Sequence, residues 1–208
     1  MAAAGVSALT IGLTGGIGSG KSMVAAMLVE SGAVLVDTDA IAHALTAPGG
    51  AALPALQQVF GADIVAADGA MDRARMRALV FSDVSARRRL EAVLHPMIGT
   101  EAELQAALAG GRPVVFDVPL LSGASSWRRR VQRVLVVDCE EHTQVRRVMQ
   151  RSGWPAEQVQ RVMAQQLSRA QRRALADAVI FNDELSVAAL QAQVRSLWRH
   201  WSQLPCPA

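Results

Sequence analysis

The sequence predicts a three-layer α/β/α fold, in which helices flank a five-stranded parallel sheet. Five short apolar runs rich in Val and Ile are separated by stretches with helical patterns. Near-continuous apolar runs of this kind are typical of parallel strands that are buried on both faces. The first run leads through a glycine-rich segment into a helical pattern, which is the strand–loop–helix order of such folds.

The five predicted strands are each followed closely by a polar residue. The strands are LTIGL (9–13), AVLVD (33–37), PVVFDV (113–118), RVLVVD (133–138) and AVIF (178–181). The polar residues at their ends are Asp37 and Asp39, Asp117, Asp138, and Asn182. Because ligands of open parallel sheets bind beyond the carboxyl ends of the strands, we expect these residues to form the rim of a functional site.

Residues 15–22 read GGIGSGKS and match the phosphate-loop pattern G-x-x-x-x-G-K-[ST] without a mismatch. Glycines let the backbone amides approach phosphate oxygens, and the helix that follows presents its unpaired N–H groups to the anion. Lys21 would bridge the β- and γ-phosphates, and the Ser22 hydroxyl would bind Mg²⁺. The context disfavours an accidental glycine-rich turn. The predicted nucleotide contacts are Gly16, Ile17, Gly18, Ser19, Gly20, Lys21, Ser22 and Met23.

Two helical excursions interrupt the predicted core. Residues 40–109 contain several helical stretches, far more than one crossover helix needs, and we interpret them as an inserted substrate-binding region. Residues 141–173 are helical and rich in arginine, and a break at Gly153 and Pro155 predicts two helices that form a lid. The core of this single domain, 1–208, would comprise 1–39, 110–140 and 174–208, with a last helix, SVAALQAQVRSLWRHW, packed on the sheet.

The composition is that of a globular protein that handles small anions. Of 208 residues, 51% are hydrophobic and 19% charged, and the net charge is only +3 with 4% aromatic residues. A long nucleic acid partner would call for denser basic patches, so we expect none. Only two cysteines occur, which favours a reducing cytoplasm, and no apolar run reaches the length of about 18 residues that a membrane span requires. Lys21 is the only lysine.

The segment DTD, residues 37–39, is the candidate for activating a phosphate acceptor. A carboxylate that faces the transferred phosphate can orient an acceptor hydroxyl and take its proton. Asp39 lies next to the insertion and is the first candidate, and Asp37 is the second, or a ligand to a metal-bound water. Equally, the segment could simply cap the following helix, TDAIAHAL.

An ordered set of further motifs makes the chain resemble the dephospho-coenzyme A kinase family. These motifs are IGLTGGIGSGKS, VDTDAIAHALTAPG, FGADIVAADGAMDRARMRALVFSD, LHPMI, DVPLL, RVLVVD, Gln144-x-x-Arg147, AQQ and ADAVIFN, and they extend over nearly the whole length. Many enzymes share the phosphate loop, but the series with DGxxDR and HP is far narrower.

The resemblance implies a P-loop kinase fold and transfer of the ATP γ-phosphate to the ribose 3′-hydroxyl of dephospho-CoA, with Mg²⁺ as cofactor. It implies Asp39, Lys21 and Arg147 as catalytic residues, and Arg151 as a second lid arginine on the nucleotide. Arg73 and His95 would contact dephospho-CoA together with Asp39, and Asp117 would join Ser22 at the metal. We expect no partners beyond ATP and dephospho-CoA, no membrane, and a monomer or weak homo-oligomer.

Plainer roles stay open for three of these residues. Arg73 could be a solvated residue of an arginine-rich helix, His95 a core histidine that ends a helix before Pro96, and Asp117 a structural strand-end residue. The chain also departs from the family pattern at three places. SGASSWRR follows DVPLL, Met23 replaces the usual Thr, and DELS follows Asn182.

Other functions fit the sequence less well. A small P-loop kinase acting on a nucleoside or nucleotide is the main alternative, but it should lack the DGxxDR and HP series. A GTPase would need an N-K-x-D segment, which is missing from the sequence. A regulator that binds nucleotide without catalysis should have lost Lys21, Ser22 or Asp39, and all three are present.

Overall fold

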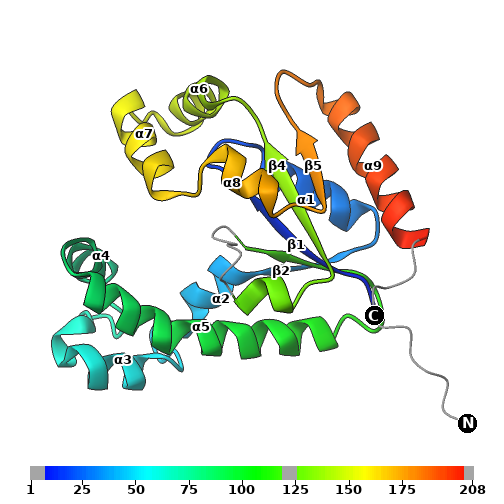
Figure 1. The fold of residues 1–208 in the computed structure, drawn as a ribbon. Coiled ribbons are helices and arrows are strands. Elements are labelled where there is room, and N and C mark those ends of the chain that lie inside the picture. The colour runs from blue at the N-terminus through cyan, green and yellow to red at the C-terminus, as the bar shows by residue number, and fades with distance from the viewer. Residues whose placement is uncertain (1–7, 119–125, 204–208) are drawn as a thin grey trace, which may run out of the picture. The chain divides into compact units, whose positions relative to one another are not determined.

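A computed structural model describes residues 8–118 and 126–203 of the chain. Within them, five strands form one sheet in the order β2-β3-β1-β4-β5 (Figure 1). Strand β1 pairs in parallel with β3 and β4, and β4 pairs in parallel with β5. The predicted five-stranded parallel sheet is therefore confirmed. The strands are β1 (Thr10–Gly15), β2 (Val34–Asp37), β3 (Val114–Asp117), β4 (Arg133–Asp138) and β5 (Ala178–Phe181).

The sequence placed β4 and β5 correctly and ended β1 two residues too early. Strand β1 continues to Gly15 because Thr14 and Gly15 pair with Val136 and Val137 of β4. The first glycine of the phosphate loop is thus part of the sheet. This fixes where the loop begins.

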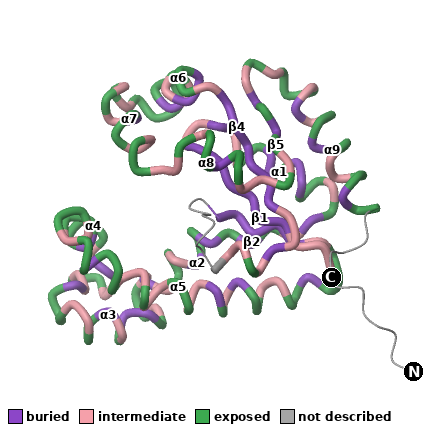
Figure 2. The backbone as a smooth tube through the Cα atoms, in the orientation of Figure 1, coloured by how far each residue is buried: buried purple, intermediate pink, exposed green. Residues whose placement is uncertain are grey.

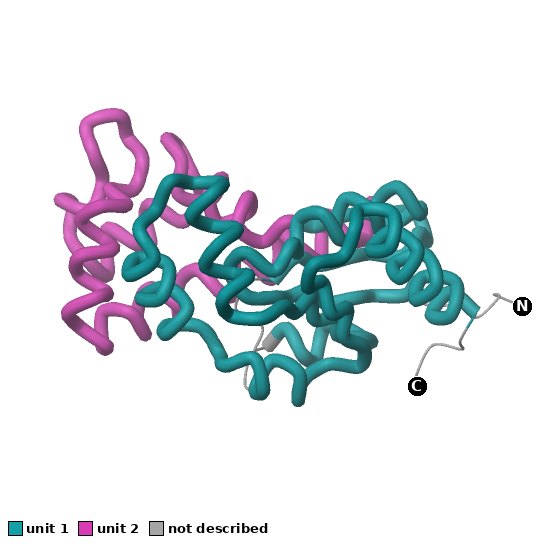
Figure 3. The backbone as a smooth tube through the Cα atoms, turned by 90° about the horizontal axis from the view of Figure 1, so that it is seen from above, with its two compact units in different colours: residues 1–36, 109–208 teal, residues 37–108 magenta. Residues whose placement is uncertain are grey.

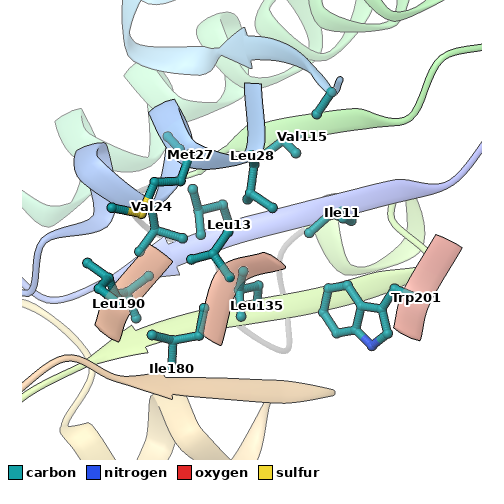
Figure 4. Close-up of a cluster of buried hydrophobic side chains, with 14 residues drawn as sticks. Ile11, Leu13, Val24, Met27, Leu28, Val115, Leu135, Ile180, Leu190 and Trp201 are labelled. Atoms are coloured by element: carbon teal, nitrogen blue, oxygen red, sulfur yellow. The ribbon is translucent and has the colours of Figure 1, made fainter. Parts of the chain in front are cut away.

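A buried apolar layer joins the sheet to α1 (Lys21–Glu30) and α9 (Val187–Gln203). Figure 4 shows Leu13 and Leu135 of the sheet close to side chains of both helices. In α9, Leu190, Val194 and Trp201 are buried, which follows the helical spacing seen in the sequence. The central strands are buried nearly throughout (Figure 2).

Residues 37–108 form a second compact unit, coloured magenta in Figure 3. Its helices have their own apolar core, which includes Leu56, Ile64 and Met76. Aspartates cap three of them, since Asp37, Asp72 and Asp83 accept hydrogen bonds from backbone N–H groups of the first turns that follow. The helices are α2 (Thr38–Leu45), α3 (Leu53–Phe60), α4 (Arg73–Ser82) and α5 (Val84–Ala107), with a short 3-10 helix, η1 (Ala62–Ile64).

Helix α5 differs from the sequence prediction because it runs without a break through Pro96. One interpretation left open from the sequence was that His95 ends a helix before Pro96. Pro96 lacks the N–H that would donate to the Ala92 carbonyl, and its ring crowds that carbonyl, but the contacts of α5 with α2, α3 and α4 keep the helix continuous. His95 is exposed in mid-helix. The interpretation of His95 as a core histidine at a helix end is therefore wrong.

The predicted two-helix lid contains three helices within the first unit, namely α6 (Glu141–Ser152), α7 (Ala156–Gln165) and α8 (Arg169–Ala174). Gly153 ends α6 in the left-handed region, at φ 67°. A third helix begins at a capping box in which the Ser168 and Gln171 side chains bond each other's backbone N–H groups. Helix α8 was not predicted from the sequence, because six residues are too few to show a helical period.

Part of the unusual SGASSWRR segment lies outside the described residues, as does Cys206. Of that segment, only the 3-10 helix η2 (Ser126–Arg129) is described, and there the Trp127 ring lies 5.4 Å from the Phe116 ring. Among the described residues, no helix combines the length and the apolar character that crossing a membrane requires.

Candidate active site

The loop between β1 and α1 has the shape of an anion-binding nest. Gly18 and Gly20 have φ values of 75° and 92°, in the left-handed region that favours glycine. The Ser19 N–H donates to the Gly16 carbonyl at 3.1 Å, which curls the loop back on itself. Helix α1 begins at Lys21, directly after the loop, so its first N–H groups lack partners within the helix. These are the groups that bind phosphate in such loops.

Neighbouring residues of the fold leave no room for a side chain at two glycines of the loop. A Cβ atom on Gly15 would lie 2.7 Å from the Val137 carbonyl oxygen, and one on Gly20 would lie 2.3 Å from Asn182 Nδ2. Any larger residue at either position would therefore displace β4 or Asn182. The glycines serve both the curvature of the loop and its packing.

Lys21 and Asp117 form an ion pair at the carboxyl end of the sheet. Asp117 is the last residue of β3 and is only 8% exposed, whereas Lys21 is the first residue of α1. The strand thus places a carboxylate where it orients the lysine ammonium next to the phosphate loop. Ser22, the next residue, is exposed in the first turn of α1.

Arg147 and Asn182 hold the far side of the loop through its carbonyl groups. Arg147 Nη1 donates to the Asn182 carbonyl at 3.0 Å and lies 3.5 Å from the carbonyl oxygens of Gly18 and Ser19. Asn182 Nδ2 donates to the Ser19 carbonyl at 2.8 Å. Carbonyl groups turned toward these donors leave the loop amides to face an anion.

The other predicted nucleotide contacts lie at the surface. Arg151 is exposed in the last turn of α6, one turn beyond Arg147, and its Nε lies 3.4 Å from Ser152 Oγ. Met23 is 45% exposed in α1. The structure therefore brings Arg147 against the loop and leaves Arg151 and Met23 exposed.

The opposite side of the loop contacts three further polar residues of the lid segment. Gln166 Oε1 accepts the Ile17 N–H at 3.0 Å. The side chains of Gln144 and Arg172 are buried against Gly16, because a Cβ there would lie 2.6 Å from Gln144 Oε1 and 2.8 Å from Arg172 Nη2. Gln144 and Gln166 lie within the Q-x-x-R and AQQ motifs, and Asn182 ends ADAVIFN. For the two glutamines these motifs were the only sequence signal, whereas Asn182 was also expected at the rim because it follows the fifth strand.

Behind the loop, charged groups of the lid segment pair with each other. Arg169 bonds Asp138 through Nε and Nη2, both at 3.0 Å, and it also pairs with Glu140. These hydrogen bonds raise the pKa of Arg169 above its ordinary value, Asp138 contributing most. Cys139, between the two acids, is fully buried, and this burial raises the pKa of its thiol to about 11. The thiol is therefore neutral at ordinary pH.

In the second unit, the two aspartates of DTD have different environments. Asp37 is the N-cap of α2, and its Oδ1 accepts hydrogen bonds from the N–H groups of Asp39 (2.9 Å) and Ala40 (3.0 Å). The expected capping role is thus filled by Asp37. Asp39 lies in the first turn of α2 and is exposed.

Arg73 is more than a solvated arginine, since its Nη2 donates to Thr46 Oγ1 at 2.8 Å. Thr46 is buried, and its own hydroxyl donates to the Ala42 carbonyl at 2.8 Å. The DR of the DGxxDR motif therefore links the start of α4 to the end of α2, with Asp72 capping α4. His95 is exposed on α5.

Comparison with known proteins places this architecture in a family. Residues 9–187 match the family model described as dephospho-CoA kinase. The chain belongs to the dephospho-CoA kinase family. The match includes the phosphate loop, the whole second unit and the three lid helices, so every candidate residue named above lies within the part that defines the family.

Individual relatives agree with this assignment. The dephospho-CoA kinase of Burkholderia pseudomallei is 55% identical over 199 residues, which cover 96% of this chain and 97% of that protein. A crystal structure from Thermus thermophilus is 32% identical, with a TM-score of 0.80, and covers 93% of this chain and 97% of that one. A dephospho-CoA kinase from Campylobacter jejuni shares the fold at 20% identity and a TM-score of 0.67, with the same coverage.

Proposed function

We propose that this chain transfers the γ-phosphate of ATP to the ribose 3′-hydroxyl of dephospho-CoA and so yields coenzyme A and ADP, the last step of coenzyme A synthesis. The observation that carries the proposal is a formed phosphate loop, with Lys21 held by Asp117, in a chain matched from residue 9 to residue 187 by the dephospho-CoA kinase family. Phosphoryl transfer needs positioned charge more than covalent help from the protein, and this loop supplies it.

The loop and α1 would hold the triphosphate. The amides of Gly18, Gly20, Lys21 and Ser22 would donate to phosphate oxygens, since those of Ile17 and Ser19 already donate to Gln166 and Gly16. Lys21 would move from Asp117 to the β- and γ-phosphates as charge develops during transfer. Arg147 would keep the loop carbonyls turned away and would add positive charge close to the leaving group. Met23 and Arg151 would contact the nucleotide from the first turn of α1 and the last turn of α6.

The residues at the end of β3 fit a magnesium ion. Mg²⁺ prefers oxygen ligands and usually takes one or two from the protein, the rest coming from phosphates and water. The exposed Ser22 hydroxyl and the Asp117 carboxylate at the strand end supply such oxygens, Asp117 acting directly or through water. When bound, the ion would neutralise charge on the phosphates. No cluster of three or more acidic, His or Cys residues that could hold a metal occurs in the described ranges, in keeping with a site completed by phosphates.

The second unit would supply the acceptor site. Asp39 is the proposed base that takes the proton of the ribose hydroxyl, and it is favoured over Asp37 because the Asp37 carboxylate is engaged in capping α2. We propose that Arg73 and His95 contact dephospho-CoA. Arg73 would do so from a position fixed by Thr46, and His95 from the exposed face of α5.

The lid, residues 141–173, would close over ATP and exclude water. Its two ends already contact the phosphate loop, through Arg147 at one end and Gln166 at the other. Closure of such segments protects the activated phosphate from hydrolysis. We further propose a cytoplasmic enzyme that acts as a monomer or weak homo-oligomer, with ATP and dephospho-CoA as its partners.

The assay that tests the proposal offers the purified protein ATP, Mg²⁺ and one of four acceptors, namely dephospho-CoA, adenosine, AMP or water. We expect ADP release with dephospho-CoA to be faster by about a hundredfold or more than with the others. Faster turnover with adenosine or AMP would instead identify a nucleoside or nucleotide kinase. Turnover with water alone would identify an ATPase.

A further inference from the structure

Arg172 is a buried cation beside the phosphate loop. It lies in α8 with only 7% of its surface exposed. Its Nη1 donates to the Leu167 carbonyl, and its Nη2 lies against Gly16. Its Nε has no hydrogen-bond partner in residues 8–118 and 126–203. Burial of a guanidinium with an unsatisfied N–H is costly, which calls for an explanation.

No carboxylate in the described part of the chain pairs with Arg172. The acids that act on its charge from a distance are Asp138, which Arg169 binds, and Glu141 in the first turn of α6. Burial lowers the pKa of the Arg172 guanidinium, yet arginine remains charged in proteins. Asp138 and Glu141 favour the charged guanidinium, but no carboxylate in the described ranges forms an ion pair with it.

A second unsatisfied atom faces the same glycine. Gln144 is 1% exposed, its Oε1 lacks a hydrogen-bond partner among the described residues, and this atom lies beside Gly16 together with Arg172 Nη2. Next to them, Gln166 accepts the Ile17 N–H, and Arg172 binds the carbonyl of the following residue, Leu167. Segment 166–172 and Gln144 thus surround the first half of the loop.

We propose that Arg172 is a further positioning residue for nucleotide binding: the phosphates of the bound nucleotide supply the counter-charge that its guanidinium lacks, and its contact with Gly16 holds the start of the loop in place. This inference rests on the proposed binding of a nucleotide triphosphate. Gly16 has no side chain to separate the guanidinium from an anion that the loop would hold, and the attraction between two charges is stronger where water is excluded. Arg172 then destabilises the protein without ligand, and the bound phosphates remove this destabilisation by pairing with its charge.

The test compares two neutral variants, Arg172→Met and Arg172→Gln, with a charged one, Arg172→Lys. Arg173→Met is the matched control, because Arg173 neighbours Arg172 in α8 but its side chain is 57% exposed. For each protein we would measure the thermal midpoint alone, with Mg²⁺ and ATP, and with Mg²⁺ and inorganic triphosphate, which lacks base and sugar. The KM for ATP and kcat would be measured with dephospho-CoA in excess.

Both neutral variants should be at least as stable as the wild type without ligand and should lose more than half of the upward shift caused by either phosphate compound. The KM for ATP should rise about tenfold or more while kcat changes less than about threefold. Arg172→Lys and Arg173→Met should stay near the wild type.

The inference is overturned if the neutral variants keep the wild-type KM and ligand shift. It is also overturned if both unfold or lose stability without ligand, since Arg172 would then be a structural clamp. If neither compound stabilises the wild type itself, the proposed nucleotide binding fails, which is a distinct result.

Discussion

Lys21 illustrates how a single residue is prepared for catalysis by its neighbours. Its ammonium group is held by Asp117 at the tip of β3, so the side chain is extended along the rim before it meets phosphate. Every other basic residue except histidine is arginine, whose planar group cannot take the same place. The pairing also explains why the strand-end aspartate and the loop lysine belong to one site.

We expect Lys21→Met to lower kcat by about a hundredfold or more, because the variant removes the charge that stabilises the transferred phosphate. Lys21→Arg should recover less than about a tenth of the wild-type kcat, since the guanidinium is too broad for the loop. Steady-state rates with dephospho-CoA check both values, and circular dichroism checks that the fold is kept. A Lys21→Arg enzyme with full activity would show that only the charge matters.

Asp37 and Asp39 offer a paired comparison two residues apart. Asp39→Asn should lower kcat by about a hundredfold or more, because an amide cannot take the acceptor proton. Asp37→Ala should cost about 1 kcal/mol of unfolding free energy through loss of the α2 cap and should leave kcat within about threefold. Urea unfolding and kcat measurements on both variants separate the roles. Reversed effects would make Asp37 the base.

Cys139 gives a pH dependence with a definite sign. Burial raises its pKa from 9.0 to about 11, so between these values the unfolded chain loses the thiol proton and the folded chain keeps it. The contribution of Cys139 to stability should therefore fall as the pH rises from about 9 to about 11. In a Cys206→Ser background, Cys139→Ala should remove this part of the pH dependence of the unfolding free energy. An unchanged slope would contradict the assigned pKa.

At the scale of elements, the phosphate loop depends on what surrounds it as much as on its own glycines. Strand β4 packs closely on Gly15, and Asn182 packs closely on Gly20. Side chains of the lid segment pack on Gly16. Gly20→Ala should therefore abolish detectable ATP binding and cost more than about 2 kcal/mol of stability, since it combines a left-handed φ with a clash. Isothermal calorimetry and denaturant unfolding measure the two effects.

Gly32→Ala is the control for that variant, because Gly32 also has a left-handed φ, 106°, but nothing lies within 4 Å of a Cβ atom placed there. It should cost about 1–2 kcal/mol and leave ATP binding unchanged. If Gly20→Ala behaves in the same way, the Asn182 contact adds nothing to the loop.

The helices and strands also show which structural features the sequence pattern predicts and which it does not. Apolar runs located all five strands, because burial on both faces leaves a strong signal. The phosphate loop was equally clear from its spacing. Helix α8 and the continuity of α5 were missed, since a six-residue helix has little periodicity and the packing that keeps α5 straight past Pro96 is tertiary. The roles of Gln144, Gln166 and Arg172 likewise depend on which residues the fold brings to Gly16.

At the scale of the whole molecule, each of the two compact units contains an apolar core of its own in the described residues. One joins the sheet to α1 and α9, and the other, with Leu56 at its centre, holds α3, η1, α4 and α5 together. The phosphate loop belongs to the first unit, whereas Asp39, Arg73 and His95 belong to the second. Damage to one core should therefore affect one substrate more than the other.

Leu56→Ala should raise the KM for dephospho-CoA about threefold or more while the KM for ATP stays within about twofold, because it loosens the helices that carry the proposed acceptor contacts. Leu190→Ala is the matched control in the other core, where the same atoms are deleted from an equally buried leucine. Each change should cost about 2–5 kcal/mol of stability, seen in denaturant unfolding. The assignment of one substrate to each unit requires that Leu190→Ala, at a similar loss of stability, leaves the KM for dephospho-CoA near the wild type. Equal increases of both KM values in both variants would mean that the two cores act as one cooperative body.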